Sequence, residues 1–506
     1  MIIRKTLLAA TALIALSGAA PSPIPLLELG SLAKLGTIDA RYQGYNVEMV
    51  EITGGRFWAP YGGPVGEVYR QRPPIDLTNP RLVALAKGLG PSLMRVSGTW
   101  ANNTYLEAPG EHLSAPPAGF VQVLTRDQWK AAVGFSKAVD ARLVISFAVS
   151  NGTRGADGVW TTVQAQRLLD LTRDAGGSLY AAEFFNEANV PSAAPEMPKH
   201  YTVDNYGAEF RIFSAWAKAN TPEMKIIGPG GVGEGSLTKD IPVNAFGTHI
   251  STEDMLKQNP NSVDALSYHF YGTVSQRCTQ LGIGTAVKAD SLKPTWLDRT
   301  LLDADFYSAL RNKYEPGKPV WNTETAQAAC GGSPWASTFL DSFRYLNQNG
   351  ALAQRGVQVV MHNTLAASDY ALIDRDTLNP RPNYWAAVLW RRTMGTTVLA
   401  SPSSTSPELR LYAHCLSGRP GGVGVMALNT GTAPQRLSVG RNAMSWTMTG
   451  QPIDTRAVLI NGRAPGLNSR GELTGLAGAP VRGSLALPSQ SIAFVAVPGA
   501  NNPACR

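Results

Sequence analysis

Short apolar runs alternate with helical patterns along most of the chain, and this alternation restricts the fold more than any other feature. Eight runs occur, at residues 45–50, 93–96, 143–149, 180–185, 225–227, 265–271, 319–323 and 357–361. Helical spacing of apolar residues separates several of them, at 81–87, 126–139, 162–173, 205–219, 300–312 and 335–347. Eight strands alternating with helices are typical of a parallel barrel. The sequence therefore predicts an α/β fold with a (β/α)8 TIM barrel over residues 41–396.

The sequence changes character after Thr396. Residues 397–506 lack helical spacing, and their short apolar runs are separated by clusters of Gly, Pro, Asn and Ser. Such a pattern is typical of a β-sandwich, and the Ser- and Pro-rich residues 401–407 mark the boundary. Residues 20–40 precede the first barrel strand, and we expect them to join the β-sandwich domain.

Residues 1–19 have the pattern of a secretory signal peptide. Arg4 and Lys5 precede an apolar stretch at 7–16, and Ser17-Gly18-Ala19 forms a cleavage site. The stretch is too short to span a bilayer, and no later run reaches the roughly 18–20 apolar residues that a spanning helix needs. We therefore expect export to the periplasm or the extracellular space without membrane insertion. Export would also permit disulfides.

Positive charge is concentrated near the C-terminus. The formal net charge is +8, and residues 400–506 hold nine arginines, no lysine and three acids. Dispersed arginines are commonly a solvated surface, although a basic patch can also attract nucleic acid, anionic lipid or an acidic polysaccharide. No basic run or basic helix indicates nucleic acid, so we expect no nucleic-acid partner.

We expect neither a metal nor a cofactor. The four cysteines have no CxxC spacing and no HxxxH motif accompanies them, so they indicate disulfides rather than zinc. Residues 228–233, GPGGVG, fit a dinucleotide-binding pattern. Residues 234–246, however, contain Pro242 and no clear amphipathic helix to hold a pyrophosphate at its N-terminus.

Two predicted strands end in glutamates. The fourth run leads into Asn186-Glu187 and the seventh into Glu324. Reactive groups gather at the carboxyl ends of barrel strands, and strands four and seven lie on roughly opposite sides of the ring. Glycoside hydrolysis needs two facing carboxyl groups, one to protonate the leaving oxygen and one to attack the anomeric carbon, about 5–5.5 Å apart in retaining enzymes. Asn186 is placed to hold the sugar 2-hydroxyl.

Motifs over most of the chain follow a characteristic order. They are GYNVE at 44–48, RVSGT at 95–99, FNEAN at 185–189, YHFY at 268–271, TETA at 323–326, GG at 331–332, GVQVVM at 356–361, DY at 369–370, NYW at 383–385 and GT at 395–396. This ordered set resembles the heparanase-like β-glucuronidases, which are retaining glycosidases of glycoside hydrolase family 79 in clan A.

The resemblance implies a role for each matching residue. Glu187 corresponds to the acid/base and Glu324 to the nucleophile. Family members hold the uronate carboxylate with amides of the glycine-rich loop after the nucleophile and with a tyrosine after strand eight. These correspond to Cys330-Gly331-Gly332 and Tyr370, although Ala329 and Cys330 depart from the family pattern, so the amides involved stay open.

Four further residues complete the expected substrate site. By the same comparison, Glu48 and Thr99 would contact the sugar, and Tyr271 would lie near the nucleophile. His269 ends strand six and is a candidate residue of the barrel rim. A lone histidine in such a position is also commonly a structural hydrogen-bonding group.

The cysteines are expected to form two disulfides. Cys415 ends a strand-like run and Cys505 follows the last one, and the family carries a matching pair. Cys278 and Cys330 follow strands six and seven, whose loops are neighbours. The expected pairing is therefore Cys415 with Cys505 and Cys278 with Cys330.

The sequence leaves several functions open. The first is an endo-β-glucuronidase acting on an acidic polysaccharide such as heparan sulfate, and the second is an exo-β-glucuronidase releasing terminal glucuronic acid. An open cleft lined by Lys and Arg would favour the first, and a lid on the non-reducing side would favour the second. The alternatives are a retaining barrel enzyme for neutral sugars, such as an arabinofuranosidase, and a glycan-binding protein without catalysis.

Overall fold

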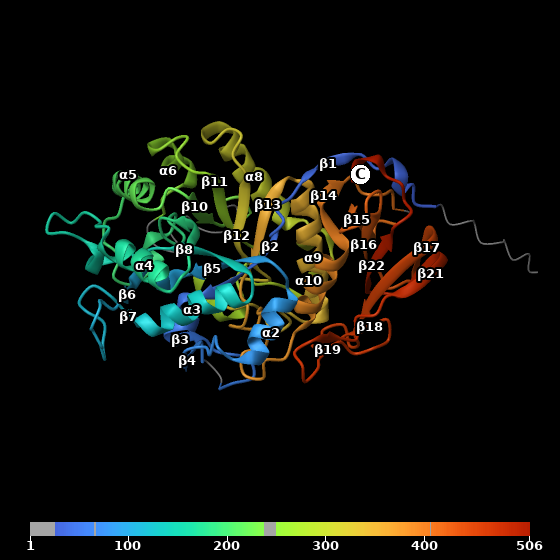
Figure 1. Ribbon diagram of the computed structural model, residues 1–506, viewed down its shortest axis with the longest axis horizontal. Coiled ribbons are helices and arrows are strands. Elements are labelled where there is room, and N and C mark those ends of the chain that lie inside the picture. Colours follow the sequence, from blue (N-terminus) through green and yellow to red (C-terminus); the bar gives the residue numbers. More distant parts are fainter. Residues whose placement is uncertain (1–25, 65–66, 237–248, 405) are drawn as a thin grey trace, which may run out of the picture.

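The computed structural model describes residues 26–64, 67–236, 249–404 and 406–506. Eight parallel strands close into a barrel, in which the last strand pairs with the first (Figure 1). They are β2 (Gln43–Glu48), β5 (Ser92–Ser97), β8 (Ala141–Ser146), β9 (Leu179–Glu183), β10 (Lys225–Val232), β11 (Ala265–Tyr271), β12 (Val320–Ala326) and β13 (Val357–His362). Each overlaps one of the eight apolar runs, so the predicted barrel is confirmed.

Helices fill most connections between the barrel strands. They are α1 (Met49–Thr53), α2 (Pro80–Gly88), α3 (Arg126–Ala138), α4 (Val163–Asp174), α5 (Val203–Asn220), α6 (Thr252–Gln258), α7 (Pro294–Leu297), α8 (Arg299–Tyr314), α9 (Phe339–Gln354) and α10 (Pro382–Thr393). Side-chain caps fix several starts, such as Asn79 before α2 and the capping box of Thr125 and Gln128 in α3.

Several element boundaries differ from the sequence prediction, and two of the differences have a clear structural reason. Helix α9 begins at Phe339 rather than at residue 335, because Ser337 has a φ of 51°, which is incompatible with a right-handed helix. Strand β10 continues through Gly228–Val232, where Gly231 and Val232 pair with Tyr268 and His269. The glycine-rich segment is therefore barrel strand, which agrees with the rejection of a dinucleotide loop.

Two small strand pairs extend the rim at the carboxyl ends of the barrel strands. The hairpin of β3 (Gly55–Trp58) and β4 (Tyr69–Arg72) follows β2, and the pair β6 (Thr104–Leu106) and β7 (Gln122–Leu124) follows β5. Ligand sites of parallel barrels form on this rim.

The second domain is an antiparallel sheet that bends over itself as a sandwich. Its strands are β1 (Lys34–Thr37), β14 (Met394–Leu399), β15 (Leu409–Leu416), β16 (Val423–Asn429), β17 (Gln435–Thr449), β18 (Leu459–Ile460), β21 (Ala479–Leu487) and β22 (Ser491–Val497), beside a hairpin of β19 (Gly466–Leu467) and β20 (Leu473–Thr474). Register shifts near Gly440 bend β17, which pairs first with β21 and then with β22.

Alternate residues of this sheet enter two different cores. In β16, Val425 and Ala427 pack inside the sandwich, whereas Met426 and Leu428 join the large core that includes the barrel helices. This is the period of two expected for a strand buried on both faces. The sandwich is therefore packed against the barrel through α9 and α10 (Figure 1).

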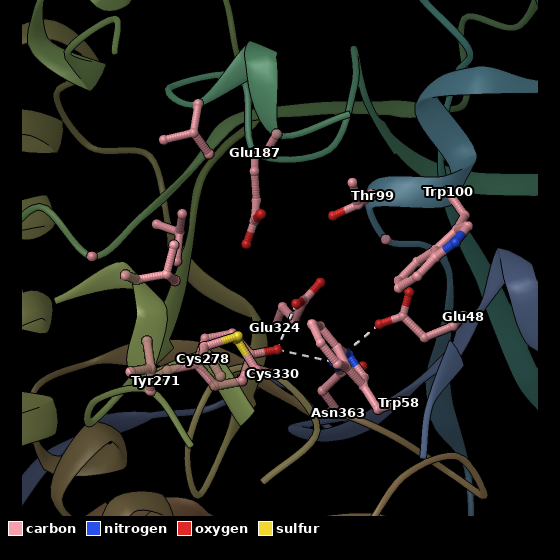
Figure 2. A pocket seen from close by; sticks show the side chains of 18 of the residues that line it. Glu48, Trp58, Thr99, Trp100, Glu187, Tyr271, Cys278, Glu324, Cys330 and Asn363 are labelled. Carbon is pink, nitrogen blue, oxygen red and sulfur yellow. Dashed lines mark hydrogen bonds between the residues drawn. A yellow bond between two sulfur atoms is a disulfide. The ribbon is translucent and has the colours of Figure 1, made fainter. Parts of the chain in front are cut away.

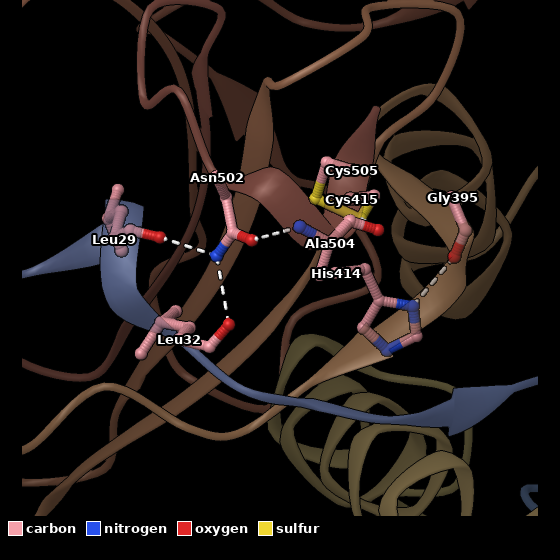
Figure 3. Close-up of a disulfide and its surroundings, with 8 residues drawn as sticks. All are labelled: Leu29, Leu32, Gly395, His414, Cys415, Asn502, Ala504 and Cys505. Carbon is pink, nitrogen blue, oxygen red and sulfur yellow. Dashed lines mark hydrogen bonds between the residues drawn. A yellow bond between two sulfur atoms is a disulfide. The ribbon is translucent and has the colours of Figure 1, made fainter.

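The N-terminal and C-terminal segments meet in this domain. Strand β1 pairs with β14, and the amide of Asn502 donates from Nδ2 to the carbonyls of Leu29 and Leu32 at 2.8 and 2.9 Å (Figure 3). The signal peptide predicted at residues 1–19 lies outside the described residues. Within the described ranges, no helix combines the length and apolar character needed to cross a membrane.

Both expected disulfides are present, Cys278–Cys330 and Cys415–Cys505. The double variant Cys415→Ser, Cys505→Ser should lower the free energy of unfolding by about 2–4 kcal/mol, since the bond closes a long loop and ties the C-terminal segment to β15. Urea denaturation followed by fluorescence measures this loss. An unchanged denaturation midpoint would contradict the prediction.

Candidate active site

A cavity of about 710 Å³ opens at the carboxyl ends of the barrel strands (Figure 2). Below it is called the central cavity. A few convergent polar groups in a largely apolar lining are typical of a ligand site. The lining includes eight residues that the sequence singled out, namely Glu48, Thr99, Glu187, Tyr271, Cys278, Glu324, Cys330 and Tyr370.

Glu187 and Glu324 come together in this cavity. One carboxylate oxygen of each and a ring nitrogen of His269 lie within 4.8 Å of one another. This is the close spacing of retaining glycosidases, about 5–5.5 Å between carboxyl groups, and not the wider spacing of inverting ones. Glu187 also has a φ of 51°, a conformation that is uncommon for residues with a Cβ and occurs preferentially at functional sites.

Arg95 of β5 is the centre of a buried polar network beside the two glutamates. Its guanidinium donates to Glu324 Oε2 at 2.8 Å, to Glu183 Oε2 at 2.7 Å and to Asn186 Oδ1 at 2.8 Å. The Nε2 atom of His269 lies 3.1 Å from the same guanidinium. Arg95 on β5 is therefore connected to β9 and the residues after it, to β11 and to β12.

Glu183 supplies the permanent negative charge that balances Arg95. Its Oε1 accepts hydrogen bonds from Ser267 and Thr323, both at 2.7 Å. Burial disfavours the charged carboxyl, but Arg95, His269 and these hydroxyl donors more than offset it, and the pKa of Glu183 lies below its usual value. Glu183 and Arg95 thus form a buried ion pair, and removal of Arg95 would leave the charge of Glu183 without its guanidinium partner.

Glu324 has a fixed donor on each carboxylate oxygen. Arg95 holds Oε2, and the hydroxyl of Tyr271 donates to Oε1 at 2.6 Å. Asn363 Nδ2 lies 2.9 Å from that hydroxyl (Figure 2). The same atom lies 3.1 Å from the hydroxyl of Tyr370. Burial, and then the neighbouring carboxylates, raise the pKa of both tyrosines, so both remain neutral donors.

The environment of Glu187 differs from that of Glu324. The side chain of Glu187 is 17% exposed against 7% for Glu324. Its Oε1 lies 3.2 Å from His269 Nδ1, and the ring can donate or accept there depending on its tautomer. A carboxylate held by a guanidinium is fixed as an oriented anion, whereas a more exposed carboxyl beside an imidazole is suited to exchanging a proton.

Asn186 is fixed behind Glu187 and does not itself line the cavity. Its backbone N–H donates to Asn102 Oδ1 at 3.0 Å, and Asn102 Nδ2 donates to its carbonyl at 2.9 Å. Its side-chain Oδ1 accepts from Arg95 and, at 3.3 Å, from Ser97. The Nδ2 group is therefore the atom of Asn186 left for a substrate hydroxyl.

Fewer residues of the loop after Glu324 line the cavity than the sequence predicts. Cys330 lines the cavity, but Gly331 and Gly332 do not. A methyl group at Gly331 would lie 2.8 Å from Trp58, and one at Gly332 would lie 3.2 Å from Tyr370. These two side chains cover the glycines, which explains why only residues without a Cβ fit there.

Arg277 fixes this loop from the opposite side. Its guanidinium donates to the carbonyls of Ala59 and Gly332 and forms an ion pair with Asp369. It also stacks on Tyr61, with 3.8 Å between the guanidinium carbon and the ring centroid. The loop is thus held by a cation as well as by the Cys278–Cys330 disulfide.

The position of the Glu48 carboxyl group requires a glycine at residue 98. Asn363 donates to its Oε1 at 3.0 Å, while burial, and then the charge of Glu324, raise the pKa of Glu48 and favour its protonated form. Gly98 has a φ of 90°, and a methyl group there would lie 1.6 Å from Glu48 Oε2. No side chain can replace this hydrogen without moving the carboxyl group.

Gly98→Ala should therefore lower kcat/KM on an aryl β-glucuronide by about 10²-fold, because a sugar-contacting group is displaced. The strained backbone should also cost about 1–3 kcal/mol of stability. Steady-state kinetics and urea denaturation measure the two effects. Gly134→Ala is the matched control, since Gly134 lies in α3 with open space around it. Equal kinetics for both variants would contradict the role of Gly98.

Glu187, His269 and Glu324 also have the spacing of three possible metal ligands. The guanidinium of Arg95, however, donates to Glu324 and lies 3.1 Å from His269. A fixed positive charge at that position opposes a second cation. We therefore assign the cluster to proton transfer and carboxylate chemistry.

The sequence reasoning assigned no role to Arg95, Glu183 or Asn363. The sequence does indicate a role for Arg95 and Glu183, because both are charged residues inside apolar runs. A charge buried in such a run needs a partner. His269, for which both a rim position and a structural role were open, is buried and lies between Arg95 and Glu187, within hydrogen-bond distance of both. Thr99 lies on the cavity wall, as expected.

The barrel and its facing glutamates define the class of protein, a glycosidase. The chain is similar to heparanase-like protein 1 of Arabidopsis thaliana (25% identity, 69% of this chain, 63% of that protein) and to heparanase of Mus musculus (26%, 85% and 88%). It is also similar to hyaluronoglucuronidase of Hirudo nipponia (24%, 85% and 92%). These matches confirm the resemblance to the heparanase-like family, whereas no family profile matches the chain.

Solved structures show the same fold at low identity. A family 51 arabinofuranosidase from Xanthomonas axonopodis pv. citri superposes with a TM-score of 0.60 at 18% identity, over 91% of this chain and 97% of that chain. A 4-O-α-L-rhamnosyl-β-D-glucuronidase from Fusarium oxysporum gives 0.63 at 13% identity, over 94% and 99%. The architecture of barrel and sandwich is thus shared with glycosidases of different specificity.

Proposed function

We propose that the protein is a retaining β-glucuronidase, with Glu324 as nucleophile and Glu187 as acid/base. The main support for this proposal is that the two glutamates have different hydrogen-bond partners and different exposure. Glu324 is held by Arg95 and Tyr271 as an oriented anion, whereas Glu187 is more exposed and lies beside the imidazole of His269. Two carboxyl groups with separate tasks are what double displacement requires.

The reaction then proceeds in two steps. Glu324 attacks the anomeric carbon while Glu187 donates its proton to the glycosidic oxygen, so the leaving group departs and a glycosyl ester forms on Glu324. Glu187 next takes a proton from water, whose oxygen attacks the anomeric carbon and releases Glu324. Arg95 stabilises the Glu324 carboxylate as it is restored, and Asn186 Nδ2 is the group we assign to the sugar 2-hydroxyl.

The assignment of a uronate as substrate rests on Tyr370 and the loop at 330–332. Tyr370 presents a neutral hydroxyl beside the nucleophile. Of this loop, Cys330 lines the cavity, and we assign its backbone N–H to the carboxylate, since such amides are fixed, neutral donors to anions. The relatives named heparanase and hyaluronoglucuronidase also support a glucuronic-acid-containing glycan as substrate.

For the cleavage mode, we propose endo action on an acidic polysaccharide. The volume of the central cavity falls within the range of drug-sized ligands and leaves room for more than one sugar ring. Among the described lining residues, Arg56 is the single lysine or arginine, so the basic lining that would favour endo action is not found there and the proposal rests on the size of the cavity. This lining favours a glycan of modest charge density over a densely sulfated one such as highly modified heparan sulfate. Exo release of terminal glucuronic acid is the alternative.

Substrate selectivity tests this proposal. We expect kcat/KM for 4-nitrophenyl β-glucuronide to exceed that for the β-glucoside by about 10²-fold or more, because donors built for an anion stay unpaired against a hydroxymethyl group. Tyr370→Phe should lower this ratio. Comparable rates on both glycosides in the unmutated enzyme would instead support a neutral-sugar glycosidase. Size-resolved digestion of a polysaccharide then separates endo from exo action.

We also propose that the protein is exported. The signal-peptide pattern at residues 1–19 and the two disulfides support an oxidising compartment, since such bonds persist outside the cytosol. Mass determination of the mature N-terminus after expression with the full sequence tests this proposal.

A further inference from the structure

A second cavity, of about 290 Å³, has Trp58 in common with the wall of the central cavity. Below it is called the second cavity. Three parts of the chain enclose it, which are α1 with the β3–β4 hairpin, the loop between β13 and α10, and the loop of the sandwich between β17 and β18. Its charged lining residues are Glu51, Arg72, Asp369, Asp374, Arg375, Asp376, Arg381 and Arg456. The reaction proposed above uses none of them.

Arg375 is the arginine of this cavity with the weakest ionic partner. The other three arginines each pair with an aspartate, namely Arg72 with Asp376, Arg381 with Asp374 at 2.9 Å and Arg456 with Asp369 at 3.3 Å. Among the described residues, Arg375 has no carboxylate at hydrogen-bond distance. Its Nη2 group donates to the carbonyl of Pro73, and its Nη1 atom lies 3.9 Å from Glu51 Oε1.

Glu51 compensates this charge poorly because its carboxyl group is deeply buried. Glu51 is 1% exposed, and burial raises its pKa to about 7, although the charge of Arg375 and a hydrogen bond from Glu48 oppose the rise. A large share of Glu51 is therefore protonated near neutral pH. Its Oε2 accepts from the backbone N–H of Glu48 at 2.8 Å, whereas Oε1 has no hydrogen-bond partner within the described ranges.

Arg381 has a buried donor that is not used. It is 7% exposed, and its two Nη groups donate to the carbonyls of Ser368 and Asp369 and to the carboxylate of Asp374. Its Nε group, however, has no partner in the part of the chain that the structure describes. Burial lowers the pKa of Arg381, and the charge of Arg456 lowers it further, so these two cations repel each other. An anion between them would satisfy the donor and remove the repulsion.

The charge balance of the second cavity also favours a bound anion. Four guanidinium groups line it, and Arg277 adds a fifth because it shares Asp369 with Arg456. Three aspartates and the partly protonated Glu51 oppose them. The volume lies just below the range of drug-sized ligands, about 300–1,000 Å³, so the anion that fits is small.

We propose that the second cavity binds a free tetrahedral oxyanion of the sulfate or phosphate type, with Arg375, Arg381 and Arg456 as its donors. The three guanidinium groups come from two loops, one of the barrel and one of the sandwich, and can meet several oxygens of one anion. A bound anion would strengthen a junction that the N–H of Phe339 already makes with the carbonyl of Thr455 at 2.9 Å. The inference does not depend on the proposed function.

Calorimetric titration with sodium sulfate, sodium phosphate and sodium acetate tests the site, with sodium chloride keeping the ionic strength constant. The unmutated protein should bind one sulfate or phosphate per chain, and acetate more weakly, because its two oxygens meet fewer donors. Glucose 6-sulfate should also bind more weakly than free sulfate, since the cavity is too small to enclose the ring as well. The thermal unfolding midpoint should rise along the same saturation curve, whereas general exclusion of sulfate from the protein surface gives a rise that does not saturate.

Four variants locate the anion. Arg375→Gln should raise the Kd about tenfold or more. Glu51→Gln should lower the Kd, because the amide oxygen can still accept from Glu48 while the charge that competes for Arg375 is gone. Arg456→Gln changes a side chain that is 40% exposed and should also weaken binding, which keeps the test valid if Arg375→Gln does not fold. Arg56→Gln is the matched control on β3, and since Arg56 lines the central cavity, the Kd should not change.

The opposite shifts expected for Arg375→Gln and Glu51→Gln separate an anion site from a general loss of structure. Absence of saturable binding, or a midpoint rise that is the same in the unmutated protein and in Arg375→Gln, overturns the site. Weaker binding by Arg56→Gln and not by Arg375→Gln would place the anion in the central cavity and overturn it as well. Acetate or glucose 6-sulfate binding as tightly as sulfate would contradict a free tetrahedral anion.

Discussion

Glu324→Gln should reduce turnover of every β-glucuronide by about 10⁴–10⁶-fold, to the background rate. An amide cannot form the glycosyl ester, and among the described residues that line the cavity no other carboxylate is held by both a guanidinium and a phenol. The fold should survive the change, because the amide oxygen can accept from Arg95 while its NH₂ group donates to Tyr271. Steady-state kinetics and urea denaturation measure activity and stability on the same preparation.

Two controls sharpen this experiment. Glu196→Gln makes the same change at an exposed site near Glu187 and should leave turnover unchanged. Glu324→Ala with added azide should regain partial activity and release the α-glucuronyl azide, since the anion enters where the carboxylate stood. Substantial turnover by Glu324→Gln, or inversion of anomeric configuration by the unmutated enzyme in NMR, would contradict double displacement.

Glu187→Gln should cost about 10²–10⁴-fold on polysaccharide and far less on activated aryl glucuronides. Only the poor leaving group of a natural glycan needs a proton, so the loss should grow with the pKa of the leaving alcohol. Rates on a series of substituted phenyl glucuronides measure this dependence. Azide should accelerate the variant on activated substrates and yield the β-glucuronyl azide. Equal losses across the series would contradict the acid/base role of Glu187.

The barrel could be predicted because its signal is local. Each strand is a short apolar run, and the helices between them have their own spacing and caps. Strand β10 was underestimated because Pro229 and its glycines have little strand preference by themselves and gain it from pairing with β11. The start of α9 was misplaced because a positive φ at Ser337 leaves no clear trace in the sequence.

The two glutamates of the site could be predicted because they too have a local sequence signal. Glu187 and Glu324 follow recognisable strands, so their meeting could be expected from topology. The network around Arg95 could not, because its partners lie on strands far apart in sequence and only the closed barrel brings them together. The contact between Trp58 and Tyr69 could not be predicted either, since the two residues become neighbours only through the pairing of two very short strands.

The pairing of β1 with β14 has a consequence for how the chain is made. Lys34 emerges from the ribosome early, but its partner Leu399 follows only after the whole barrel has been synthesised. The edge of β14 that faces β1 therefore stays unpaired until β1 binds to it. Long-range pairing of this kind is slow and exposed to misassembly. A shortened protein containing the barrel alone must omit residues 26–40 together with the sandwich, because β1 would otherwise remain an unpaired edge that can add to another chain.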